Sequence, residues 1–153
     1  MAIDNIHDQL IRDEKEVLWV YDDANSKPIL PGYLVIGNPT IGIGRNISKG
    51  STGISQDISR LMERDDVNRC ESALGIWCPW AQKTVDKVRY NVLVNMTFNM
   101  GIAGLIKFTE FLRCMQTNDW TGAAQAMTDS KWFKEVGARA VRLREQILTG
   151  VWQ

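Results

Sequence analysis

The stretch that decides the fold is residues 11–44, IRDEKEVLWVYDDANSKPILPGYLVIGNPTIGIG. Before and into it, Ile3, Ile6 and Leu10 recur at helical spacing, so a short amphipathic helix is expected over residues 3–13. Turn-forming Asn, Ser, Gly and Pro residues then separate apolar, β-prone runs at Val17–Tyr21, Tyr33–Ile36 and Thr40–Gly44. This pattern predicts a small sheet that follows a helix.

Polar side chains stand at the ends of these expected elements. Glu14 closes the helix, Asp23 lies just beyond the first strand, and Thr40 opens the glycine-rich run. Cleaving a bond between two sugars requires a carboxylic acid that protonates the leaving oxygen. It also requires a second polar group that directs a water onto the anomeric carbon. Glycines beside such groups let a bulky polymer lie against bare backbone, so the stretch favours a site for cleaving polysaccharide.

The remainder of the chain has helical periodicity. Ser55 is a suitable N-cap for a long helix over about residues 55–75. A wide apolar face between Val85 and Met100 indicates a buried helix at the centre of a second lobe. Further helices are expected around 108–116, around 119–128, and over a last segment that stops at Gly150.

The predicted fold class is therefore α+β. A small N-terminal sheet lobe covers about residues 14–54, and the helix over about 55–75 joins it to the rest. A larger helical lobe covers about 76–153 and includes the N-terminal helix. We expect a cleft between the two lobes of this single domain.

At this point the chain resembles the phage lysozymes of the T-even type, a family of muramidases that open bacterial cell walls. The resemblance covers nearly the whole chain, because the matching blocks follow one another in the family's order. These blocks are Ile11-Arg12-Asp13-Glu14, Tyr21-Asp22-Asp23, Thr40-Ile41-Gly42-Ile43-Gly44, Asn95-Met96-Thr97-Phe98-Asn99-Met100-Gly101, Ser130-Lys131-Trp132-Phe133 and Thr149-Gly150-Val151-Trp152.

The resemblance implies roles for particular residues. Glu14 would be the general acid, and Asp23, with help from Thr40, would hold or activate the water. Arg139, aligned from the Ser130–Phe133 block, would lie against Glu14. The residues expected to contact the sugars are Met96, Phe98, Asn99 and Gly104.

Simpler interpretations stand beside these roles. Asp22 is the alternative to Asp23, since strand alternation turns only one of them toward a cleft; the Glu14-to-Asp23 spacing equals the family's and favours Asp23. Thr40 is also an ordinary β-favouring residue, and both Met96 and Phe98 would suit a hydrophobic core.

The sequence also departs from the family. Sixteen residues separate Asp23 from Thr40, where the T-even type has only a handful, and this Ala24–Pro39 insertion reads as an enlarged hairpin that could contact substrate, gate the cleft or bind a protein. Arg45 replaces a histidine, and Asn99 replaces a glutamine. Phe111 and Ala126 stand where the best-known members have polar residues that contact substrate.

Charge and composition limit the partners. The net charge is zero, with eight basic and twelve acidic residues in 1–80 but ten basic and six acidic in 81–153. The second half would therefore suit an anionic polymer such as peptidoglycan, although solvated surfaces that merely differ give the same counts. A nucleic-acid binder would carry a basic excess, so none is expected. No apolar run reaches the roughly 18 residues of a membrane helix.

No secretory signal is recognised in the charged first 16 residues. We therefore expect synthesis in the host bacterial cytoplasm and action on the wall after release through the inner membrane. By resemblance, a separate holin-type pore protein would provide that release. The protein is expected to be a monomer.

Cys70, Cys78 and Cys114 lack metal-ligand spacing, and His7 has no partners, so neither a metal nor a cofactor is expected. Cytoplasmic synthesis favours free thiols, with a Cys70–Cys78 bridge as the alternative. Two competing functions remain at this stage. A lytic transglycosylase would not need Asp23 and Thr40, and a non-catalytic wall-binding or phage structural protein would not need Glu14.

Overall fold

The computed structural model describes residues 10–11, 13, 16–51 and 53–153. It divides into two compact units, Met1–Ile58 and Ser59–Gln153, which are described separately below. Most of the helix expected over 3–13 lies outside the described residues. Within that range the structure describes Leu10, Ile11 and Asp13, and all three are helical. The lobe boundaries and the cleft expected from the sequence stay predictions.

The described part of the first unit contains a four-stranded antiparallel sheet in the order β2-β1-β3-β4. Its strands are β1 (Val17–Asp22), β2 (Lys27–Pro28), β3 (Pro39–Gly42) and β4 (Arg45–Asn46). In the central pairing, Tyr21 lies opposite Thr40 and Asp22 lies opposite Pro39, after a bulge nearer to Val17. This register places the carboxyl end of β1 beside the start of β3.

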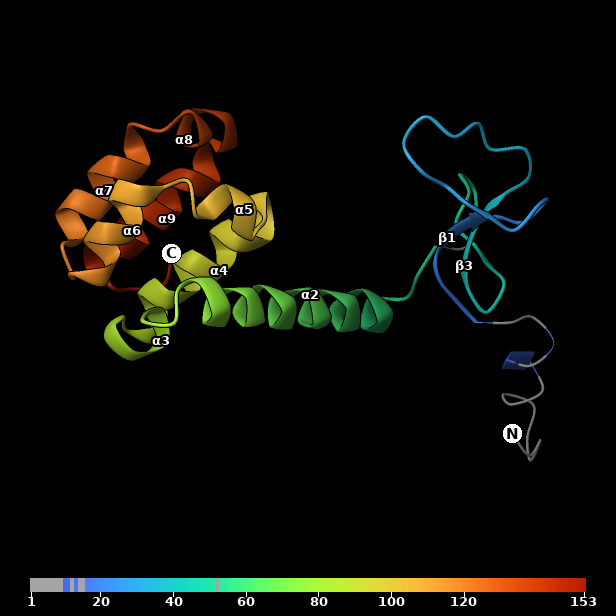
Figure 1. The fold of residues 1–153 in the computed structure, drawn as a ribbon, viewed down its shortest axis with the longest axis horizontal. Coiled ribbons are helices and arrows are strands. Elements are labelled where there is room, and N and C mark those ends of the chain that lie inside the picture. The colour runs from blue at the N-terminus through green and yellow to red at the C-terminus, as the bar shows by residue number, and fades with distance from the viewer. Residues whose placement is uncertain (1–9, 12, 14–15, 52) are drawn as a thin grey trace. The chain divides into compact units, whose positions relative to one another are not determined.

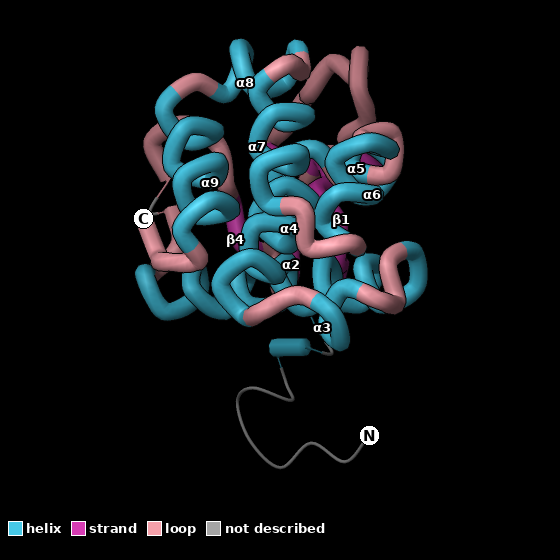
Figure 2. The backbone as a smooth tube through the Cα atoms, turned by 90° about the vertical axis from the view of Figure 1, so that its left-hand side faces the viewer, coloured by secondary structure: helices cyan, strands magenta, loops and turns pink. Residues whose placement is uncertain are grey.

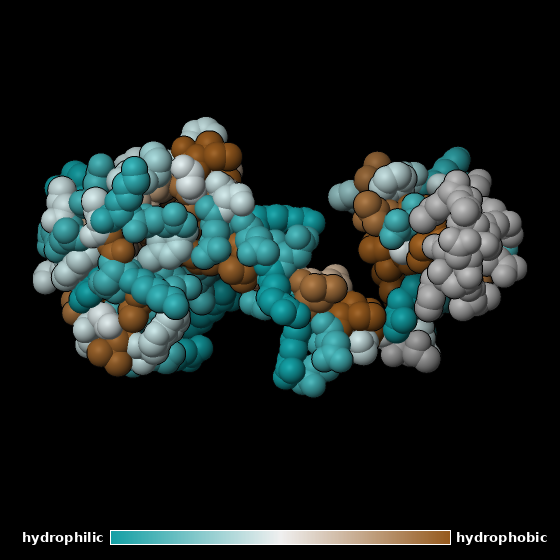
Figure 3. Space-filling view, turned by 90° about the horizontal axis from the view of Figure 1, so that it is seen from below, coloured by the Kyte–Doolittle hydropathy of each residue, from teal (hydrophilic) through white to brown (hydrophobic). Residues whose placement is uncertain are grey.

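The chain between β2 and β3 differs from the sequence prediction. The strand predicted at Tyr33–Ile36 is wrong, since these residues have no strand structure. The Tyr33 hydroxyl and the Ile36 N–H instead donate to the Asp22 side chain, which leaves the segment without ladder pairing. The exposed side chains of Leu34 and Ile36 add to the apolar surface of this unit, which is brown in Figure 3.

The second unit is helical, as the periodicity predicted. Its longest helix is α2 (Gln56–Trp77), which is labelled in Figure 1. The division between the units falls within the first turn of this helix. It corresponds to the helix predicted over 55–75. The other helices are α3 (Ala81–Thr84), α4 (Lys87–Met100), α5 (Ile102–Leu105), α6 (Thr109–Gln116), α7 (Trp120–Thr128), α8 (Lys131–Val136) and α9 (Ala138–Thr149).

Helix α4 is the buried central helix that the sequence predicted. The Asp86 side chain caps its N-terminus by accepting from the Arg89 N–H, and Gly101, with φ 73°, ends it. Helix α9 packs against both α4 and α7, and α7 also packs against α6 (Figure 2). The core side chains come from all of these helices, among them Leu93, Met96, Phe111, Met127 and Ile147. The sheet and the helical body together confirm the α+β class.

Candidate active site

Asp22 is a buried carboxylate that closes the β2–β3 connection. It accepts hydrogen bonds from the N–H groups of Ile36 at 2.7 Å, Gly37 at 2.9 Å and Ala24 at 3.0 Å. The Tyr33 hydroxyl donates to it at 3.3 Å. These donors, the Ile36 N–H first, lower the pKa of Asp22 below 3.8 although its burial acts in the opposite direction. Asp22 is thus a structural anion held inside the unit.

Asp23 has the opposite surroundings. Its side chain is exposed, and Asn38 holds both carboxylate oxygens. The Asn38 N–H donates to Oδ1 at 2.6 Å, and the Asn38 Nδ2 donates to Oδ2 at 3.0 Å. The placement favours Asp23 over Asp22 as the carboxylate that solvent or substrate can reach.

Thr40 is linked to Asp23 through the same asparagine. Its hydroxyl donates to the Asn38 carbonyl at 3.2 Å, and that carbonyl also accepts the Asp23 N–H at 3.1 Å. Thr40 itself is only 3% exposed. The structure therefore brings Asp23 and Thr40 together around a residue that sequence reasoning interpreted only as part of a turn. No sequence signal identified Asn38, because its place beside Asp23 follows from the strand register, which pairs Asp22 with Pro39.

Gly37 is required where these two carboxylates approach the backbone. A Cβ atom at this position would lie 2.1 Å from Oδ1 of Asp23 and 2.8 Å from Oδ1 of Asp22. Both distances are far shorter than a van der Waals contact, so a side chain here would displace at least one of the acids. The turn interpretation of Gly37-Asn38-Pro39 had no information on this crowding.

The remaining member of the predicted catalytic set, Glu14, lies outside the described residues. Arg139, its predicted neighbour, is part of the helical unit. Its Nε donates to Oδ1 of Asn95 at 2.8 Å, and the two side chains help to line a groove of about 400 Å³. Phe98, 45% exposed, lines the same groove. The other lining residues are Glu63, Val67, Asn91, Val94, Gln146 and Trp152.

The other predicted sugar-contacting residues have different environments. Asn99 accepts a hydrogen bond at its Oδ1 from Nε1 of Trp132 at 2.7 Å. Met96 is fully buried in the helical core, which favours the simpler interpretation of it as a packing residue. Gly104 lies in α5, where an added Cβ would meet the Met100 side chain at 2.8 Å.

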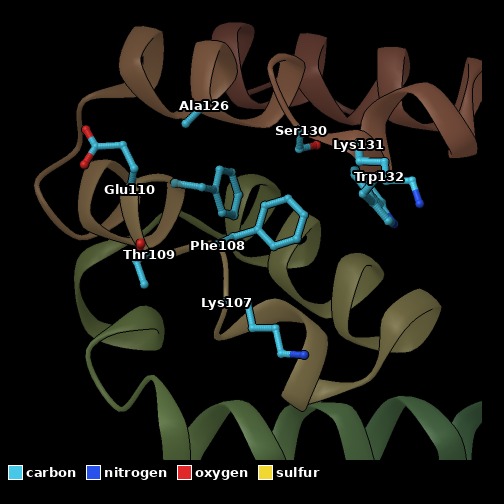
Figure 4. A pocket seen from close by; sticks show the side chains of 9 residues that line it. Lys107, Phe108, Thr109, Glu110, Ala126, Ser130, Lys131 and Trp132 are labelled. Atoms are coloured by element: carbon cyan, nitrogen blue, oxygen red, sulfur yellow. The ribbon is translucent and has the colours of Figure 1, made fainter.

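A second cavity of about 430 Å³ lies between α6, α7 and α8. Phe111 and Ala126, two of the positions at which the sequence departs from the family, line this cavity. Figure 4 shows the Phe108 ring near the centre of the cavity, with Trp132 to its right and Lys107 below it. The Phe108 ring makes edge contacts with Trp132 and Phe111, at centroid distances of 6.2 and 6.3 Å. This cavity therefore has an aromatic floor made of Phe108, Phe111 and Trp132.

Metal chemistry finds no support in the part of the chain that the structure describes, since no three His, Cys, Asp or Glu side chains gather there as metal ligands would. Within the same residues, no helix combines the length and apolar character needed to cross a membrane. Cys70, Cys78 and Cys114 are free thiols. Burial raises the pKa of the Cys78 and Cys114 thiols, which suits packing residues rather than nucleophiles.

Comparison with known proteins places this geometry in context. A sequence profile described as phage lysozyme matches residues 26–146. The chain belongs to the phage lysozyme family. Thr40, Phe98 and Arg139 fall inside the matched range, and so does most of the Ala24–Pro39 insertion.

Three relatives of this phage lysozyme family member illustrate the similarity. The "Pre-baseplate central spike protein Gp5" of Enterobacteria phage T4 is 32% identical over 94% of this chain, which spans 27% of that protein. "Probable T4-type lysozyme 1" and "Probable T4-type lysozyme 2" of Dictyostelium discoideum are 25% and 26% identical. Each of these matches covers 97% of this chain and 96% of the relative. The resemblance to the T-even type is thereby confirmed.

Proposed function

We propose that this protein is an N-acetylmuramidase that hydrolyses the β-1,4 bond between N-acetylmuramic acid and N-acetylglucosamine in bacterial peptidoglycan. Membership in the phage lysozyme family supports the coarser statement, a lysozyme-type peptidoglycan hydrolase. The observation that carries the finer proposal is the exposed Asp23 carboxylate, oriented by Asn38 and linked to Thr40. A water-activating base needs this combination of access and fixed orientation.

In the proposed reaction, Glu14 donates its proton to the glycosidic oxygen as the bond between that oxygen and the anomeric carbon breaks. Asp23 takes a proton from a water whose oxygen forms the new bond to the same carbon, and Thr40 helps to hold that water. By resemblance, this is a single displacement that inverts the configuration. Arg139 would lie against Glu14, and the sugars would contact Phe98, Asn99 and Gly104.

The protein would act on the cell wall from inside its host. We propose synthesis in the bacterial cytoplasm, release through a holin-type pore, and action as a monomer on peptidoglycan. Nucleic acid and stable membrane insertion have no part in this scheme. The lysis of the host bacterium would be the biological result.

A second candidate is a virion-associated role, in which the same fold serves as part of a phage particle. One observation favours it, namely the 32% identity to a protein named as a baseplate central spike component. A non-catalytic version would not need Glu14 or Asp23. A lytic transglycosylase, the remaining alternative, would leave Asp23 and Thr40 without a task.

The test is mass spectrometry of the muropeptides released from purified peptidoglycan by the wild type, Glu14→Gln and Asp23→Asn. We expect products with reducing-end N-acetylmuramic acid from the wild type, and a rate lower by roughly 10²- to 10⁴-fold in either variant. Asp129→Asn removes another exposed carboxylate and serves as the control that should retain full activity.

The other outcomes separate the alternatives. Anhydro products would identify a transglycosylase, and full activity of Glu14→Gln would remove that residue from the reaction. Binding without cleavage by the wild type would support the structural role. Equal rates for Asp23→Asn and Asp129→Asn would contradict the assignment of the base.

A further inference from the structure

Asn38 connects the two residues that the proposed reaction needs on the water's side. Its N–H and Nδ2 donate to the two oxygens of the Asp23 carboxylate at 2.6 and 3.0 Å. Its carbonyl accepts both the Asp23 N–H at 3.1 Å and the Thr40 hydroxyl at 3.2 Å. Backbone and side chain of one asparagine thus determine where the carboxylate and the hydroxyl lie relative to each other.

The insertion places Asn38 in this position. Asn38 lies 15 residues after Asp23, at the C-terminal end of the insertion. The two residues before it are bound to the buried Asp22 carboxylate. The Ile36 and Gly37 N–H groups donate to Asp22, and Asn38 follows them directly. Pro39 then starts β3 opposite Asp22. The end of the insertion is therefore bound to Asp22 through Ile36 and Gly37, and to Asp23 through the residue that follows them.

An exposed aspartate normally samples several rotamers, and each rotamer points its lone pairs in a different direction. With both oxygens held by Asn38, one orientation is selected, and each oxygen retains a lone pair for a water. Fixing a reacting group before substrate binds lowers the barrier to reaction without changing how substrate is bound.

We propose that Asn38 is a positioning residue of the hydrolytic reaction, which orients Asp23 and couples it to Thr40. This inference rests on the proposed function. Asn38 acts through Asp23 and does not itself need to touch the substrate. Its removal should therefore reduce kcat and leave KM nearly unchanged.

The experiment compares Asn38→Ala, Asn38→Asp and a matched control, Asn25→Ala, on solubilised peptidoglycan fragments. Asn25 lies in the same insertion, in the turn between β1 and β2. Its Nδ2 donates to the Tyr33 hydroxyl and its Oδ1 accepts the Lys27 N–H, so neither of these bonds involves Asp23. We expect Asn38→Ala to lower kcat roughly 10- to 100-fold, as for the loss of a hydrogen bond to a charged group. Asn38→Asp keeps the size but replaces the donor with a like charge, so its kcat should fall at least as far. Asn25→Ala should keep the wild-type kcat.

A double variant distinguishes positioning from general damage. If Asn38 acts through Asp23, then Asn38→Ala should have no further effect on kcat in the Asp23→Asn background. Additive losses, equal losses in Asn25→Ala, or a wild-type rate in Asn38→Asp would each overturn the inference. These outcomes differ from failure of the proposed function, in which the wild type itself hydrolyses nothing and the inference falls with it.

Discussion

Asp22 and Asp23 are adjacent in the sequence, yet their carboxylates have opposite surroundings. Asp22 is fully buried at the end of β1, whereas Asp23 is exposed in the turn that follows. Successive side chains of a strand point to opposite faces, so the sequence predicted that only one of them faces a cleft. Asp22 is the buried one because the chain folds back and the Ile36 and Gly37 N–H groups donate to its carboxylate.

This burial predicts a pH-dependent stability at the scale of one residue. The Ile36 N–H and the other donors hold the pKa of Asp22 below 3.8, so the folded state keeps the carboxylate ionised at a lower pH than the unfolded chain does. Its contribution is complete above the unfolded value of about 3.9 and is lost as the pH falls through the folded pKa.

We therefore expect the thermal midpoint of the wild type to fall as the pH is lowered from about 4 to about 3. Asp22→Asn should lower the thermal midpoint at pH 7. The amide NH₂ of asparagine is a donor and would face backbone N–H groups, which now donate to the carboxylate oxygens. The Asp22→Asn variant should also show a smaller change of the thermal midpoint with pH than the wild type. The measurement is circular dichroism melting across this pH range, and parallel curves for the two proteins would contradict the assigned role.

Helix α4 carries buried core residues and an exposed groove residue next to one another. The apolar periodicity predicted a buried helix, and α4 is buried over Val92–Val94 and at Met96 and Thr97. The next residue, Phe98, is however 45% exposed and lines the groove. The helix therefore has both core residues and surface residues within the single run that resembles the family.

Substitutions on α4 should separate these two roles. Met96→Ala should lower the free energy of unfolding by about 2–5 kcal/mol, because it leaves a cavity in the core, and should leave KM unchanged in the folded fraction. Phe98→Ala should cost less stability and raise KM several-fold. Urea unfolding and steady-state kinetics measure both quantities. A raised KM for Met96→Ala with little loss of stability would return Met96 to the substrate site.

At the scale of the whole molecule, charge is unevenly divided along a chain with no net charge. Residues 81–153 carry ten basic and six acidic side chains, whereas residues 1–80 carry eight basic and twelve acidic. Several basic groups are also committed locally, such as Arg113 to Glu110 and Arg144 to Glu145. The excess left in the helical part would attract an anionic wall polymer.

This attraction should be sensitive to salt, because exposed charges are screened within roughly 8 Å at physiological ionic strength. We expect KM for anionic peptidoglycan to rise several-fold between about 0.05 and 0.5 M NaCl, with kcat nearly constant. An uncharged chitin oligosaccharide is the matched control and should show no such rise. Equal salt dependence for the two substrates would show that the charge division has no part in binding.

The sequence by itself determined the features that depend on near neighbours. Helical periodicity and the predicted caps at Ser55 and Gly150 act over a few residues, so α2, α4, α7 and α9 could be placed from them. The β-prone runs before residue 45 and the helical periodicity after residue 55 determined the α+β class in the same way. Only the tertiary structure decided the burial of Asp22, the absence of a strand at Tyr33–Ile36, and the grip of Asn38 on Asp23. Each of these depends on hydrogen bonds between groups 11 to 15 residues apart, whose partners exist only once the strand register and the closure of the insertion bring them together.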